Sequence, residues 1–305
     1  MTFMAKSYFR LDRALTLGLA QPVSRVSRRF SRCRIPVLMY HGISNDIGMS
    51  HPYFETNTST VVFKHQMQHL HDHGYKPINL DVAVRMIGSG TCQQGAVVIT
   101  FDDGLRNFYT QAMPILQAYQ FPATMFVVSS FPGNSIIVPS DRKFMSWSEI
   151  REVESSGIMI GSHTVSHPKL RNLKPRDVER ELKDSKQAIE NQLGRTINAF
   201  SYPYAFPEQD VVFQGRLREY VIAAGYGHGV TTVLGSVHET SDRYFLPRIP
   251  MNEHDDAKLF QAKLEGAYDW LHMPQLIYKI THERFRTKNL SNKEQRQKSS
   301  LLTDI

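Results

Sequence analysis

Short apolar runs alternate with amphipathic stretches along most of this 305-residue sequence. Seven runs have the length and the apolar or β-branched composition of strands: Val37–Tyr40, Ala96–Phe101, Ala123–Val128, Ile158–Gly161, Ile197–Tyr202, Gly229–Val233 and Phe245–Ile249. Five stretches between them show the apolar spacing of helices: Phe63–His73, Asn107–Tyr119, Trp147–Ser156, Arg176–Leu193 and Asp210–Ala224. Pro175 and Gly194 flank the fourth of these, as the first turn and the C-terminal cap of a helix would require.

Repeated strand–helix units predict parallel strands joined by right-handed crossovers. Ala96–Phe101 is apolar or β-branched throughout, which is typical of a strand covered on both faces. Seven or eight such units in about 230 residues predict an α/β fold with a closed or nearly closed barrel. An open doubly wound sheet is the alternative.

Charge divides the chain into three parts. Residues 1–34 carry eight Lys or Arg and one acidic residue, and residues 271–305 carry seven Lys or Arg and three acidic residues. Because the whole chain has a net charge of +7, residues 35–270 have a net charge of −4. The folded middle part has no overall basic balance, which argues against nucleic acid as a partner. We therefore expect a basic N-terminal extension (1–34), a folded middle domain (35–270) and a basic, partly disordered C-terminal tail (271–305).

The N-terminal extension has an amphipathic pattern. Apolar side chains recur at helical spacing as far as Leu19, and Pro22 is expected to break the helix. A basic amphipathic helix predicts peripheral contact with an anionic membrane, the alternatives being packing on the protein's own body or a mobile segment. Ala14–Ala20 is short for the apolar part of a signal peptide, and no run of about 18 apolar residues exists. We expect a cytoplasmic or inner-membrane-associated protein rather than a secreted one; the sequence does not indicate an oligomeric state.

The strongest local motif is Thr100-Phe101-Asp102-Asp103-Gly104, at the end of a predicted buried strand. Enzymes with α/β barrels keep their chemistry at this end of the strands. One carboxylate can bind a cation while the other acts as a base, and Gly104 permits a sharp turn. On this motif alone, a helix N-terminal cap explains the two acids equally well.

A second motif, Ser162-His163-Thr164-Val165-Ser166-His167, also follows an apolar strand. Two histidines four residues apart can direct their imidazoles at one ion. With one carboxylate they would form a His₂Asp site with open positions, as in catalytic zinc centres.

Other histidines and both cysteines receive a plainer interpretation. His65, His69, His71 and His73 lie on or beside a predicted helix with no acid pair, and we interpret them as exposed helix residues. Cys33 and Cys92 give no reason for pairing, so free thiols are expected.

Three further segments follow predicted strands or lie on one. In Tyr202-Pro203-Tyr204, Pro203 can hold the Tyr204 amide rigidly as an oxyanion donor, although the motif is also an ordinary turn signal. His41 ends the first strand and can act as a proton donor at neutral pH. Arg248 lies on the last strand, either holding a carboxylate ionised or forming a structural ion pair.

Taken in order, TFDDG, SHTVSH, YPY and PRIP resemble the polysaccharide deacetylases (carbohydrate esterase family 4, the nodulation-deacetylase or NodB homology domain) over about residues 35–250. PVLMYHGI resembles the bacterial branch that contains poly-N-acetylglucosamine deacetylases. The resemblance implies a distorted (β/α) barrel of seven or eight parallel strands and a divalent metal bound by Asp103, His163 and His167. Zinc is the first expectation, with Co²⁺, Ni²⁺ or Fe²⁺ as alternatives. The same resemblance implies that Asp102 is the general base and that the backbone amide of Tyr204 donates a hydrogen bond to the oxyanion. His41 is then the general acid.

The activity implied is hydrolysis of N-acetyl groups on amino sugars of a polysaccharide or glycan precursor. The same site could instead serve a deformylase, an O-acetyl esterase or a cyclic amidase, and a non-catalytic carbohydrate-binding module is a further alternative. Two positions depart from the family pattern. Ala205 replaces a common glycine, and Phe200, Ser201 and Tyr202 stand where many members have an arginine, which Arg248 is expected to replace in orienting Asp102.

Overall fold

Seven parallel strands close into a barrel in the computed structural model, which describes residues 10–27, 33–46, 55–133 and 143–281. The strands are β2 (Val37–Tyr40), β6 (Ala96–Phe101), β7 (Thr124–Val127), β8 (Met159–Ser162), β9 (Ala199–Ser201), β10 (His228–Leu234) and β12 (Leu246–Pro250). They follow one another around the ring in chain order, and β2 closes it by pairing with both β6 and β12. The expected α/β barrel is confirmed with seven strands, and the open sheet is excluded.

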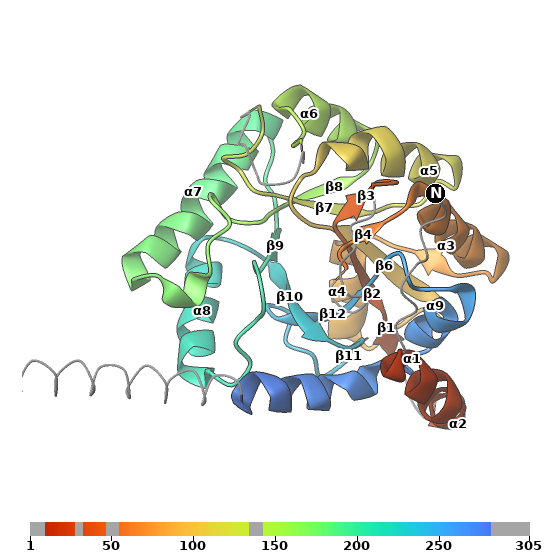
Figure 1. Cartoon of the computed structure of the whole chain (residues 1–305). Coiled ribbons are helices and arrows are strands. Elements are labelled where there is room, and N and C mark those ends of the chain that lie inside the picture. Colours follow the sequence, from red (N-terminus) through yellow and green to blue (C-terminus); the bar gives the residue numbers. More distant parts are fainter. Residues whose placement is uncertain (1–9, 28–32, 47–54, 134–142, 282–305) are drawn as a thin grey trace, which may run out of the picture.

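Helices surround the strands (Figure 1). They are α3 (Thr60–Asp72), α4 (Leu80–Ser89), the π-helical turn η2 (Phe108–Ala112) with α5 (Met113–Ala118), α6 (Trp147–Ser155), α7 (Pro175–Leu193), α8 (Val211–Ala223) and α9 (Ala257–Leu264). Pro175 begins α7, and Gly194 caps it with a left-handed φ of 69°, as expected. The sequence patterns did not predict α4 or α9.

An aromatic cluster fills the core beneath the carboxyl end of β6. Phe101 stacks on Tyr40 of β2 and meets Phe63 of α3 and Phe108 of η2 edge-on. All four side chains are fully buried. This packing fixes the strand from which Asp102 and Asp103 project.

Short strands complete the fold at both ends. β1 (Arg34–Ile35) pairs antiparallel with β11 (Val237–His238), β3 (Gly42–Ile43) pairs with β4 (Asn57–Thr58), and β5 (Lys76–Pro77) adds to the start of β6. Cys33, directly before β1, forms a disulfide with Cys92 in the loop before β6, with Cα atoms 5.1 Å apart. The expectation of two free thiols is therefore wrong. The parallel sheet brings the chain before β1 next to the start of β6, a proximity that the spacing of 59 residues does not reveal.

The N-terminal extension packs on the protein's own body. It consists of α1 (Leu11–Leu15), the π-helical turn η1 (Thr16–Ala20) and α2 (Gln21–Ser27). Arg13 forms an ion pair with Asp256 at the start of α9, and Trp270 donates a hydrogen bond to buried Thr16. Its outer side leaves three apolar side chains exposed: Leu11 (58%), Leu19 (67%) and Val23 (68%).

Pro22 does not break this helical segment, contrary to expectation. It is the second residue of α2. Amides in the first turn of a helix donate no hydrogen bond within that helix, so α2 does not need the amide proton that proline lacks. Residues 1–9 of the predicted amphipathic pattern lie outside the described residues.

The C-terminal part begins as ordered structure. η4 (Asp269–Leu271) leads into a helix over 272–281. Lys279 and His272 both contact the Glu208 carboxylate. The rest of the expected tail (271–305), from residue 282 onward, lies outside the described residues. Within the described part of the chain, no helix has the length and apolarity needed to cross a membrane.

Candidate metal centre and active site

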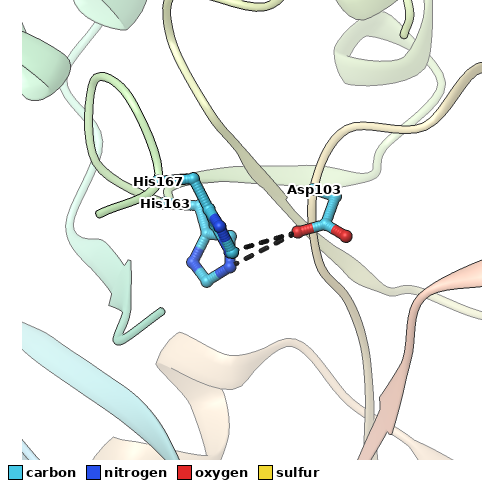
Figure 2. A group of neighbouring side chains, drawn as sticks. All are labelled: Asp103, His163 and His167. Carbon is cyan, nitrogen blue, oxygen red and sulfur yellow. Dashed lines mark ion pairs between the residues drawn. The ribbon is translucent and has the colours of Figure 1, made fainter. Parts of the chain in front are cut away.

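Three side chains converge at the carboxyl ends of β6 and β8. Asp103 follows β6, while His163 and His167 follow β8 (Figure 2). The Asp103 Oδ1 atom lies 3.6 Å from His163 Nε2 and 3.5 Å from His167 Nε2. Bonds of about 2.0–2.1 Å to a tetrahedral ion place neighbouring ligand atoms roughly 3.3–3.4 Å apart. The donor set and its spacing therefore fit one divalent cation.

A hydrogen bond orients His163, and burial keeps His167 neutral. His163 is buried, and its Nδ1–H donates to the carbonyl of Ser201 on β9 at 2.8 Å, which leaves Nε2 free as a ligand. Burial and the neighbouring His163 lower the pKa of His167 to about 4, so its ring is neutral at pH 7, as a metal ligand must be.

Glu181 of α7 holds the loop that carries these histidines. Its carboxylate accepts hydrogen bonds from the amides of Val165 and Ser166 at 2.8 and 2.9 Å and from the Ser166 hydroxyl at 2.7 Å. Sequence reasoning missed this residue, because an acid on the exposed side of a helix pattern carries no signal of a distant loop.

Backbone strain concentrates at the site. Among the described residues, five non-glycine residues have positive φ, and four of them are Asp103 (75°), Thr164 (71°), His167 (56°) and Tyr204 (59°). Such conformations persist only where the surrounding structure enforces them, and they are enriched at functional sites. The chain thus accepts unfavourable backbone geometry at two of the three candidate metal ligands.

Asp102 forms a buried ion pair with Arg248 beside the candidate metal ligands. Arg248 Nη1 and Nη2 donate to its two carboxylate oxygens at 2.8 and 2.7 Å, and both side chains are buried. Burial alone would raise the pKa of Asp102, but the charges of Arg248 and His163 outweigh burial and hold the pKa well below its usual range. Asp102 is therefore ionised at neutral pH.

Ser201, on β9, lies between Asp102 and Arg248. Its hydroxyl accepts a hydrogen bond from Arg248 Nη2 at 3.1 Å and lies 3.3 Å from Asp102 Oδ1. The guanidinium that contacts Asp102 therefore comes from β12 and not from β9. This is the role that the sequence predicts for Arg248.

His41 lies at the same end of the barrel. It directly follows β2, where Tyr40 pairs with Phe101 of β6, so His41 and Asp102 occupy corresponding positions. The side chain is half-buried, and its charge affects the pKa of both Asp102 and His167. The structure therefore brings His41 into the expected cluster.

The loop after β9 places Tyr204 against the histidines. Its ring centroid lies 4.6 Å from that of His167, and its carbonyl accepts a hydrogen bond from Thr232 at 2.9 Å. Pro203 immediately precedes it and is buried. The positive φ falls on Tyr204 and not on Ala205, whose side chain is exposed, so alanine fits where many relatives have glycine.

The histidines of α3 form no comparable group. Within the described ranges, Asp103, His163 and His167 are the only cluster of three residues that could hold a metal. His65, His71 and His73 are exposed as expected. His69 is half-buried instead, because its ring contacts Gln261 of α9 at 2.6 Å and stacks on His73.

Comparison with known proteins identifies relatives of this chain. A family model described as polysaccharide deacetylase matches residues 89–225. YxkH of Bacillus subtilis, which bears the name of a polysaccharide deacetylase, is 30% identical over 238 residues, covering 76% of this chain and 77% of that protein. The poly-beta-1,6-N-acetyl-D-glucosamine N-deacetylase of Escherichia coli is 33% identical over 119 residues, covering 34% of this chain and 17% of that enzyme.

The fold is shared with a solved structure, that of the Streptococcus pyogenes deacetylase PplD in complex with acetate. The TM-score is 0.66 at 24% identity, covering 76% of this chain and 98% of that chain. Together with the sequence match to YxkH over most of both chains, the comparisons show that this chain belongs to the polysaccharide deacetylase family.

Proposed function

We propose that the protein hydrolyses N-acetyl groups on amino sugars of a polysaccharide or glycan precursor, releasing acetate and a free amine. One observation carries this proposal: a His₂Asp ligand set lies beside an ionised, arginine-held carboxylate at the catalytic end of a polysaccharide deacetylase barrel. Relatives named as poly-beta-1,6-N-acetyl-D-glucosamine N-deacetylases support this class of substrate.

Asp103, His163 and His167 would hold the divalent ion, with zinc the first candidate from the mixed nitrogen and oxygen donors. When bound, such an ion supplies Lewis acidity that makes water nucleophilic at neutral pH and polarises a carbonyl.

Asp102 would accept the proton of the attacking water. Its low pKa keeps it ionised, and the two hydrogen bonds from Arg248 fix the direction of its oxygens. Arg248 acts through Asp102 and is a positioning residue.

The backbone amide of Tyr204 would donate to the oxyanion that develops on the acetamide oxygen. Pro203 and the hydrogen bond from Thr232 restrict this loop, so the amide is held in place before substrate arrives. His41, on the neighbouring strand end, would protonate the departing amine.

Acetate release tests the proposal. The metal-replete protein, incubated with oligomers of N-acetylglucosamine, should release acetate, and a chelator should abolish the reaction. Asp102→Asn should retain the metal and lose turnover, because an amide cannot accept the proton. Mass spectrometry of products from formylated and O-acetylated sugars distinguishes the deformylase and esterase alternatives. Binding of oligosaccharide without acetate release would instead favour a carbohydrate-binding module.

We also propose peripheral contact between the N-terminal extension and an anionic membrane. Leu11, Leu19 and Val23 are exposed on the side of the helical segment that faces away from α9. Cosedimentation with vesicles containing phosphatidylglycerol tests this contact. Leu11→Ser/Leu19→Ser should weaken it, while equal sedimentation of both proteins would contradict the proposal.

A further inference from the structure

A groove of about 320 Å³ adjoins the active site on the far side of Tyr204. The loop after β9, the short helix η3 (Leu170–Asn172) and the C-terminal helix over 272–281 line it. Two tyrosines expose their rings at the groove, Tyr204 (48%) and Tyr278 (67%). Because the Tyr204 ring also contacts His167, a sugar in this groove would neighbour the sugar at the metal centre.

Three cations line the groove, but carboxylates neutralise two of them. Arg171 donates to Asp210 at 3.0 Å, and Lys279 donates to Glu208 at 2.8 Å. Lys169 has no carboxylate within ion-pair distance among the described residues, and its Nζ lies 5.3 Å from the centre of the Tyr204 ring. The lysine therefore gives this end of the groove an uncompensated positive charge.

We propose that the groove binds the sugar next to the acetylated residue, and that Lys169 selects this neighbouring sugar by its charge. The inference rests on the proposed function. The exposed tyrosine rings offer apolar faces on which the C–H face of a pyranose can pack. The ammonium of Lys169 then favours a neighbouring sugar that carries a carboxylate and disfavours one that carries an ammonium.

The reaction itself changes the charge that Lys169 meets. Each acetamide is neutral, and each amine released from it is a cation at neutral pH. A residue next to one already deacetylated would therefore bind less well when the new amine lies in the groove. Consecutive deacetylation would slow down, and the products would carry spaced amines rather than blocks of them.

Three tetrasaccharide probes test this selection through kcat/KM for acetate release. One is neutral N-acetylchitotetraose, one alternates glucuronic acid with N-acetylglucosamine, and one is a chitotetraose with a single free amine. The wild-type protein should prefer the anionic probe to the neutral one and the neutral probe to the cationic one. Lys169→Met should reduce each preference by about two- to fivefold, the range for an exposed charge pair. Lys169→Glu should reverse the order.

Matched controls separate this role from a structural one. Lys183, exposed on α7, is the control lysine, and Lys183→Met should keep the wild-type order of probes. Metal content should be equal in all variants, and added salt should weaken the wild-type preferences because it screens exposed charges. Preferences in Lys169→Met as large as those of the wild type would overturn the proposal.

Failure of the proposed function gives a different result. No acetate release from any probe by the metal-replete wild-type protein would refute deacetylation. Calorimetric affinities of the same probes for the wild type and for Lys169→Glu would then decide the question of charge selection. Equal affinities would overturn it.

Discussion

Removal of Arg248 should destabilise the barrel, because it leaves a buried carboxylate without its counter-charge. The guanidinium donates five hydrogen bonds, two of them to Asp102, and its side chain has no exposed surface. Breaking a buried pair from one side costs about 3–5 kcal/mol. Domains are stable by only about 5–15 kcal/mol, so Arg248→Met should lower the urea midpoint substantially.

A double variant separates the lost charge pair from lost packing. Arg248→Met/Asp102→Asn removes both charges, so it should unfold at a higher urea concentration than Arg248→Met alone. Circular dichroism of the metal-replete proteins measures both midpoints, with metal content determined in parallel. Arg248→Lys keeps a positive charge but loses the paired geometry, and it should lie between the wild type and Arg248→Met. Equal urea midpoints for Arg248→Met and Arg248→Met/Asp102→Asn would refute the reasoning, because the destabilisation would then not come from an unpaired carboxylate.

Three further predictions concern the site and the disulfide. His163→Ala should strip the metal and abolish turnover, while replacement of the exposed His65 of α3 by alanine should change neither. Elemental analysis checks the metal content of both variants, and full occupancy in His163→Ala would contradict the ligand assignment. His41→Ala should lower the turnover of acetamides by roughly 10²–10⁴ and leave the metal content unchanged. It should lower the turnover of an activated aryl ester far less, since a good leaving group needs no proton. Equal losses on both substrates would indicate a positioning role. Cys33→Ser/Cys92→Ser should lower the free energy of unfolding by about 4 kcal/mol, because the disulfide closes a loop of 59 residues. Mass spectrometry of protein isolated from cells, before and after reduction, should show the bond. Free thiols in that protein would instead agree with a reducing, cytoplasmic location.

Most of the fold and the grouping of the three candidate metal ligands could be predicted because the responsible signals are local. Apolar runs mark the strands, and chemistry-bearing residues follow directly at their ends, as Asp102 and Asp103 follow β6. Parallel topology then brings those ends together. α9 escaped prediction because its pattern is interrupted by Lys263, which is buried in an ion pair with Asp255 at 2.8 Å.

The contacts that could not be predicted depend on long-range geometry. Glu181 and the Cys33–Cys92 bond act between segments whose spacing in the sequence carries no signal. The strained backbone at Asp103, His167 and Tyr204 was equally hidden, because none of these residue types signals a positive φ as glycine would.

The join between β8 and β9 gives the candidate metal centre a second role in the molecule. These two strands pair at only one position, Ser162 with Phe200. The next link along the join is the hydrogen bond from the His163 imidazole to the Ser201 carbonyl, so a candidate metal ligand also serves as a rung of the sheet. Metal binding and barrel closure would then be linked equilibria: loading the ion would stabilise the join, and loosening the join would weaken the affinity for the ion. Backbone amides of β8 and β9 should consequently exchange with solvent more slowly once the ion is bound, even those that face away from it.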